Sequence, residues 1–217
     1  MGLNWRLVTT VALGQLLIAE AGSLNTTRYI AKPLASVGFL GAAITAPRAN
    51  TPLGRIIIAS LVLAFVGDVL LLFDERATPL AFIGGIGAFL LGHVGYIFAF
   101  RRSKLYTGLF YPLLGALLLP AIVVWHWLSS ATTPGVPPEM VVPVIAYITV
   151  ITLMEATALA TAPASRYPYA QAFGATLFFL SDLFVARQVF VAQEWVNAGV
   201  GLPLYYAAQH VIAGLLY

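Results

Sequence analysis

The sequence predicts an all-α polytopic membrane protein, a bundle of eight transmembrane helices. Of its 217 residues, 60% are hydrophobic and 9% are charged, and the mean hydropathy is +0.91. Soluble domains are roughly 45–50% apolar and about 25% charged, so this composition is typical of a chain that lies largely in lipid. Eight hydrophobic runs of about 20 residues, the length that crosses a bilayer, follow one another along the chain. We expect them to form a single domain over residues 1–217.

Charged residues, prolines and glycines separate the eight runs. The first run follows Arg6 and precedes the small-residue site Ala19-Glu20-Ala21, and therefore looks like a signal peptide. Seven further spans make a first transmembrane helix the simpler interpretation. The segment SSATTPGVPPEM, between the fifth and sixth runs, is the one plainly loop-like stretch of any length. The runs predict helices at residues 4–20, 29–46, 55–73, 78–100, 106–128, 139–162, 167–191 and 195–217.

The distribution of basic residues predicts that both termini are cytoplasmic, because cytoplasmic loops carry an excess of lysine and arginine. The N-terminal segment and the second, fourth and sixth loops contain Arg6, Arg48, Arg55, Arg101, Arg102, Lys104 and Arg166. The other loops contain only Arg28 and Arg76. These residues are dispersed over the span ends, so the net charge of +3 does not indicate binding to nucleic acid.

Several predicted spans carry polar residues that lipid excludes unless they face the interior of the bundle. At 1.5 Å per residue, Asp68 and Asp182 share one depth, roughly 20–24 Å from the cytoplasmic edge. Lys32, Tyr147 and Arg187 are expected near the same level. A second, deeper group of polar residues is expected at His93, Glu155, Tyr206 and Gln209, with Tyr96 on the same helix face as His93.

Asp68 and Asp182 are the candidate catalytic residues, because two buried carboxyl groups can divide into one protonated acid and one ionised base. The alternative is a pair of structural carboxylates with Lys32 and Arg187 as partners. Each of these two cations either binds a lipid phosphate or extends to the membrane interface. The candidates for substrate binding, each with a structural role as the alternative, are Lys32, His93, Tyr96, Tyr147, Glu155, Arg187, Tyr206 and Gln209.

The residue inventory excludes several other chemistries. The chain has no cysteine, which excludes disulfides, thiolate nucleophiles and Cys-based metal sites. Its three histidines form no HxxxH or HExxH pair, so we expect no metal centre. No GxSxG elbow with a matching histidine is present, so a serine hydrolase would lack its parts. Any reaction has to use carboxylates, imidazoles and hydroxyls, and we expect no metal or organic cofactor.

Five short motifs follow one another over nearly the whole chain: Lys32-Pro33, Gly67-Asp68, FLLGHVGY, GATLFFLSDLFVARQVF and YYAAQHVIA. By these motifs the sequence resembles the lysoplasmalogenase-like integral membrane proteins of the YhhN family. The resemblance implies eight helices and an active site around Asp68 and Asp182. It also implies a reaction, the hydrolysis of the vinyl ether bond of lysoplasmalogens to a fatty aldehyde and glycerophosphocholine or glycerophosphoethanolamine.

A vinyl ether hydrolyses after protonation at carbon, so a protonated aspartate would supply the proton and an ionised one would stabilise the cation and activate water. The partners expected from this resemblance are a lysophospholipid substrate and membrane lipids, with no nucleic acid and with the oligomeric state open. The expected location is a bacterial cell membrane, or an ER-type membrane in a eukaryote. The alternative class is a proton-coupled transporter or lipid-binding membrane protein, in which the aspartates would carry protons.

Overall fold

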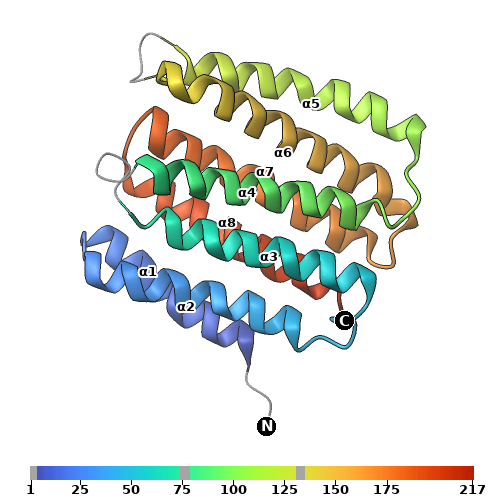
Figure 1. The fold of residues 1–217 in the computed structure, drawn as a ribbon, viewed down its shortest axis with the longest axis horizontal. Coiled ribbons are helices and arrows are strands. Elements are labelled where there is room, and N and C mark those ends of the chain that lie inside the picture. Colours follow the sequence, from blue (N-terminus) through green and yellow to red (C-terminus); the bar gives the residue numbers. More distant parts are fainter. Residues whose placement is uncertain (1–3, 74–78, 131–134) are drawn as a thin grey trace.

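The protein, represented by a computed structural model, is a bundle of helices (Figure 1). The structure describes residues 4–73, 79–130 and 135–217. Within these ranges it contains eight α-helices, two short 3-10 helices at Pro138–Met140 and Ala162–Ala164, and no β-strand. The α-helices are α1 (Trp5–Ala21), α2 (Asn25–Ile44), α3 (Pro52–Leu70), α4 (Pro79–Phe100), α5 (Thr107–Leu128), α6 (Val141–Thr161), α7 (Pro168–Phe190) and α8 (Trp195–Gly214).

The predicted all-helical class is confirmed, and each predicted range overlaps one observed α-helix. Helix α3 begins at Pro52, earlier than the predicted residue 55. The Thr51 hydroxyl accepts a hydrogen bond from the Gly54 amide at 3.0 Å, and a capping threonine followed by proline starts a helix before its apolar run begins. Arg76, which was counted in a predicted outer loop, lies outside the described residues.

Five helices, α3 to α7, are long and apolar enough to cross a membrane. The chain is therefore a multi-pass integral membrane protein. Helices α1, α2 and α8 are not in this group. Helix α1 is the shortest of the eight, with 17 residues, and α2 and α8 carry polar side chains of which Lys32 and Gln209 are largely buried within the bundle.

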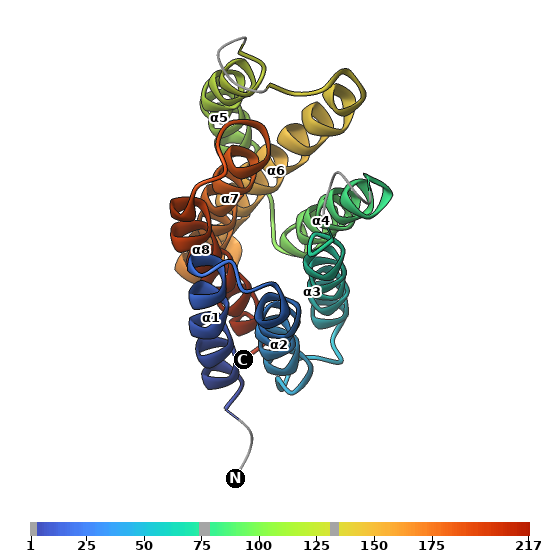
Figure 2. The same ribbon diagram turned by 90° about the vertical axis from the view of Figure 1, so that its left-hand side faces the viewer.

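Helices that are consecutive in the chain pack as pairs, α1 with α2, α3 with α4, α5 with α6 and α7 with α8. Contacts of α2 with α3 and α8, and of α6 with α4 and α7, join these pairs. Figure 2 shows α5 at the edge of the bundle farthest from α1 and α2. A Cβ atom on Gly95 would overlap the Ser60 hydroxyl, so this glycine lets α3 and α4 approach closely. The central cluster of buried side chains includes Leu61, Tyr96 and Phe178.

The two ends of the bundle carry different connections (Figure 1). One end carries the α2–α3, α4–α5 and α6–α7 connections together with the first described residue and the C-terminus, and we call it the terminal end. The other end carries the α1–α2, α3–α4, α5–α6 and α7–α8 connections, and we call it the opposite end. The first described residue and the C-terminus therefore lie at the same end of the bundle.

Candidate active site

A polar cavity enters the bundle at its opposite end. Its volume is about 740 Å³, within the roughly 300–1,000 Å³ typical of ligand-binding sites. Both candidate catalytic residues line the cavity, Asp68 from α3 and Asp182 from α7. Lys32 of α2 and Tyr147 of α6 line it as well. Four helices from distant parts of the sequence therefore bring predicted site residues to one space.

Asp68 is a buried carboxylate with several partners. It lies in the last turn of α3, and its side chain is 3% exposed. Its Oδ2 atom accepts hydrogen bonds from the Ser36 hydroxyl at 2.7 Å and from the Tyr205 hydroxyl at 2.6 Å. Its Oδ1 atom lies 3.5 Å from Lys32 Nζ. One cation and two hydroxyl donors offset the cost of burying a charged carboxylate.

Asp182 has different surroundings, since its Oδ2 atom contacts a tyrosine and a histidine and its Oδ1 atom lies 3.4 Å from the Ser181 hydroxyl. Its Oδ2 atom accepts a hydrogen bond from the Tyr147 hydroxyl at 2.7 Å and lies 3.2 Å from His93 Nε2. The Tyr147 hydroxyl and His93 Nε2 are 3.0 Å apart, so the three groups form a closed triangle. Nδ1 of the buried His93 ring has no hydrogen-bond partner among the described residues. A neutral histidine carries its proton on one ring nitrogen, and in the tautomer with the proton on Nε2 this ring donates to Asp182. No lysine or arginine of the described chain forms an ion pair with Asp182.

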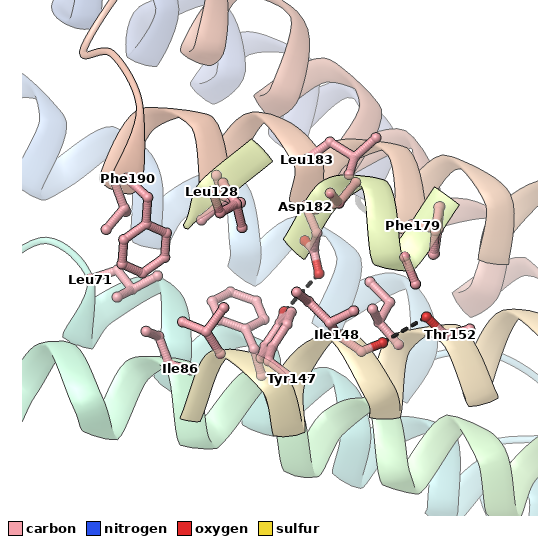
Figure 3. A pocket seen from close by; sticks show the side chains of 18 of the residues that line it. Leu71, Ile86, Leu128, Tyr147, Ile148, Thr152, Phe179, Asp182, Leu183 and Phe190 are labelled. Carbon is pink, nitrogen blue, oxygen red and sulfur yellow. Dashed lines mark hydrogen bonds between the residues drawn. The ribbon is translucent and has the colours of Figure 1, made fainter. Parts of the chain in front are cut away.

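An apolar pocket meets the polar cavity at Asp182. Figure 3 shows the Tyr147 hydroxyl pointing to the Asp182 carboxylate, with Leu183 and Phe190 among the surrounding apolar side chains. Apart from Tyr147, Asp182 and Thr152, the residues that line this pocket are aliphatic or aromatic. Asp182 and Tyr147 line both the pocket and the cavity. The Asp182 carboxyl group therefore lies on the boundary between a polar and an apolar compartment.

Three other candidates lie in the packed core and do not line the cavity. The Tyr206 hydroxyl donates to the carbonyl of Lys32 at 3.2 Å and lies 3.4 Å from the Ser36 hydroxyl. The Tyr96 hydroxyl donates to Gln209 Oε1 at 2.7 Å. These bonds join α2 to α8 and α4 to α8, so the three residues position the helices around the aspartates.

Glu155 is a further buried carboxylate, and it lines neither the polar cavity nor the apolar pocket. Its Oε1 atom accepts a hydrogen bond from the Thr176 hydroxyl at 2.6 Å, and its Oε2 atom has no partner among the described residues. Within the described ranges, no group of three or more histidine, aspartate or glutamate side chains is placed to hold a metal ion.

Arg187 connects α7 to α8 at the opposite end of the bundle. It forms an ion pair with Glu194 at 2.7 Å and donates to Asn197 Oδ1 at 2.7 Å. Five positions separate Arg187 from Asp182, which is about 140° around an α-helix. The two side chains therefore leave α7 in different directions, and Arg187 has a role in the α7–α8 connection.

Ser36 and Tyr205 contact Asp68 but were not among the sequence-based candidates. Tyr205 directly precedes the candidate Tyr206, and one residue turns an α-helix by about 100°. The pattern of polar residues did not resolve which of the two tyrosines faces Asp68. Ser36 follows Lys32 by four residues, which places both on one face of α2, and this spacing is the signal that could have identified it.

Comparisons with known proteins relate the chain to a membrane protein family. The profile of the YhhN family matches residues 27–216. Lysoplasmalogenase TMEM86B of Homo sapiens is 35% identical over 154 residues, which are 70% of this chain and 59% of that protein. Lysoplasmalogenase TMEM86B of Sus scrofa is 31% identical over 156 residues, 71% of this chain and 60% of that protein. The chain thus matches less than two thirds of the length of either relative, and no solved structure matches it.

Proposed function

The chain belongs to the YhhN family, and we propose that it hydrolyses the vinyl ether bond of lysoplasmalogens. The products are a fatty aldehyde and a glycerophospho-alcohol, with glycerophosphocholine and glycerophosphoethanolamine as the expected forms. The names of the two relatives support this reaction. The observation that carries the proposal is the position of Asp182 on the boundary between the polar cavity and the apolar pocket.

A lysoplasmalogen has the same division of polarity as this site. Its vinyl ether bond joins an apolar alkenyl chain to a glycerophosphate head. The chain fits the apolar pocket and the head fits the polar cavity, so the vinyl ether bond comes to lie beside Asp182 and Tyr147. Of the two cations that the sequence suggested for phosphate binding, Lys32 lines the cavity and Arg187 does not. In this arrangement Lys32 binds the phosphate of the head group.

In the proposed reaction Asp182 is the acid and Asp68 is the base. Tyr147 donates to Asp182 Oδ2, and His93 Nε2 lies beside the same atom. The Oδ1 atom has a long contact of 3.4 Å with the Ser181 hydroxyl, and we assign the proton to it. This proton is added to the vinyl carbon remote from oxygen, and the ether-linked carbon becomes an oxocarbenium ion. Asp68, ionised beside Lys32, stabilises the cation and takes a proton from the water that adds to it. The hemiacetal then collapses to the aldehyde: Asp182 accepts the proton of the hemiacetal hydroxyl, and Asp68 returns its proton to the departing glycerol oxygen. Both carboxyl groups are thereby restored, and one water molecule is consumed.

The proposed function is tested with the purified full chain in detergent. We expect it to release a fatty aldehyde from a lysoplasmalogen and to leave the matched lysolipid with a saturated ether bond intact, because only the vinyl ether is activated by protonation at carbon. The matched acyl lysolipid controls for general lipase activity. Cleavage of all three lipids at similar rates, or binding of the lysoplasmalogen without any turnover, would contradict the proposal and favour a lipid-binding or transport protein.

We also propose that all eight helices cross the membrane as one domain, with the terminal end in the cytoplasm. The chain lacks cysteine, so single cysteines can report on its topology. The variant Ser103→Cys at the terminal end should react with an impermeant maleimide only from the cytoplasmic side. The variant Glu139→Cys at the opposite end should react only from the other side. Labelling of both variants from the same side would contradict the eight-span arrangement.

A further inference from the structure

A second polar pocket lies at the terminal end, away from the proposed active site. Its volume is about 300 Å³. Each of the three connections at this end contributes one arginine to the lining: Arg48 from α2–α3, Arg102 from α4–α5 and Arg166 from α6–α7. The pocket is therefore formed only when three connections, far apart in the sequence, come together.

The positive charge of this pocket is not compensated by carboxylates. No aspartate or glutamate lines it, and none of the ion pairs between described residues includes Arg48, Arg102 or Arg166. Arg48 donates to the Leu215 carbonyl at 3.4 Å, and the Arg166 guanidinium lies over the Tyr167 ring, 5.3 Å from its centre. Three like charges around one space repel one another, and an anion in that space would relieve the repulsion.

The remaining lining combines hydroxyl groups with apolar surface. Ser103 and Ser165 contribute hydroxyls, whereas Leu53, Phe100 and Leu215 contribute apolar side chains. A free inorganic anion would use only the polar half of such a pocket. A phospholipid uses both halves, since its phosphate suits arginine and its glycerol and upper acyl carbons suit the apolar side chains.

We propose that this arginine pocket binds the phosphate group of an anionic phospholipid, at a site separate from the proposed active site. Guanidinium groups bind phosphate oxygens in a bidentate manner, and basic pockets between helices on the cytoplasmic side of membrane proteins suit anionic head groups. The bound lipid ties the α2–α3, α4–α5 and α6–α7 connections together. Because it binds the folded bundle, it also raises the resistance of the bundle to unfolding.

The test compares two double variants of the full chain that carry the same charge. Arg102→Gln/Arg166→Gln removes two arginines that line the pocket, and Arg55→Gln/Arg101→Gln removes two exposed arginines of the same end that do not. Binding of phosphatidylglycerol in neutral detergent is measured by native mass spectrometry. We expect the affinity to fall about tenfold or more in the pocket variant and less than about twofold in the control.

Equal losses in the two double variants would overturn the proposal, because the lipid would then follow the general surface charge. If millimolar inorganic phosphate competed as effectively as phosphatidylglycerol, the pocket would be a site for free phosphate. If phosphatidylcholine bound equally well, the pocket would have no selectivity for anionic lipid. Either result would overturn the proposal. If the pocket variant does not fold, Arg102→Lys replaces it, since lysine keeps the charge but loses the bidentate geometry. Undiminished phosphatidylglycerol binding by a folded Arg102→Lys protein would also contradict the proposal.

Discussion

Asp182→Asn is expected to lower kcat for lysoplasmalogen hydrolysis by roughly 10²- to 10⁴-fold, the range typical of a general acid. Asparagine has nearly the same shape, and its amide oxygen can still accept the hydrogen bonds from Tyr147 and His93. It cannot supply a proton to the vinyl carbon. The fold should therefore persist while the chemical step is lost, which is measured as kcat and KM in detergent beside the thermal unfolding curve.

Glu155→Gln is the matched control for this experiment. It also replaces a buried carboxyl group by an amide of the same size, but Glu155 lies outside the polar cavity and the apolar pocket. We expect its effect on kcat to be much smaller than that of Asp182→Asn. If both variants lost kcat equally, replacing any buried carboxyl group by an amide would disturb the bundle. The loss in Asp182→Asn would then not reflect acid catalysis, and the assignment of Asp182 as the acid would be wrong.

Asp68→Asn is expected to lower kcat to a similar extent, roughly 10²- to 10⁴-fold, because no carboxylate would then stabilise the cation or activate water. This change also leaves Lys32 without its ion-pair partner, and an unpaired buried charge destabilises a fold. A loss of stability alone would reduce activity, so the variant by itself does not separate the two roles.

The double variant Lys32→Gln/Asp68→Asn separates catalysis by Asp68 from its ion pair. Removing both charges relieves the unpaired lysine, so the thermal stability should recover relative to Asp68→Asn. If Asp68 is a catalytic residue, kcat stays low in the double variant, and KM rises because Lys32 no longer binds the phosphate. Recovery of kcat together with stability would show that Asp68 serves only as the partner of Lys32.

The helices could be predicted from the sequence because a span of lipid requires a long apolar run, and the boundaries of such runs are visible as charges and prolines. Ends that depend on capping were harder to place. Thr51 and Pro52 start α3 before the apolar residues begin, a local signal that an analysis of hydropathy overlooks. The hydropathy of the chain also could not show which polar residues of α2 and α8 are buried against one another.

The candidate site could be predicted only in part, because counting residues along a helix locates backbone and not side chains. His93 was expected deeper in the membrane than Asp182, yet their side chains are 3.2 Å apart. Side chains incline toward the N-terminus of their helix, and α4 and α7 run in opposite directions through the bundle. His93 therefore extends toward the opposite end and Asp182 toward the terminal end, and the two meet between the expected levels.

The central claim is that the protein hydrolyses a vinyl ether by protonating carbon. It is tested most directly by running the reaction in D₂O, reducing the aldehyde to the alcohol as it forms, and measuring the deuterium content and configuration at carbon 2. The account predicts one deuterium at carbon 2 in a single configuration, because Asp182 delivers it to one face of the bound alkenyl group. An alcohol without deuterium at carbon 2 would contradict protonation at that carbon. A racemic deuterated product would also contradict the account, since it would mean that an enol left the protein and was protonated in solution.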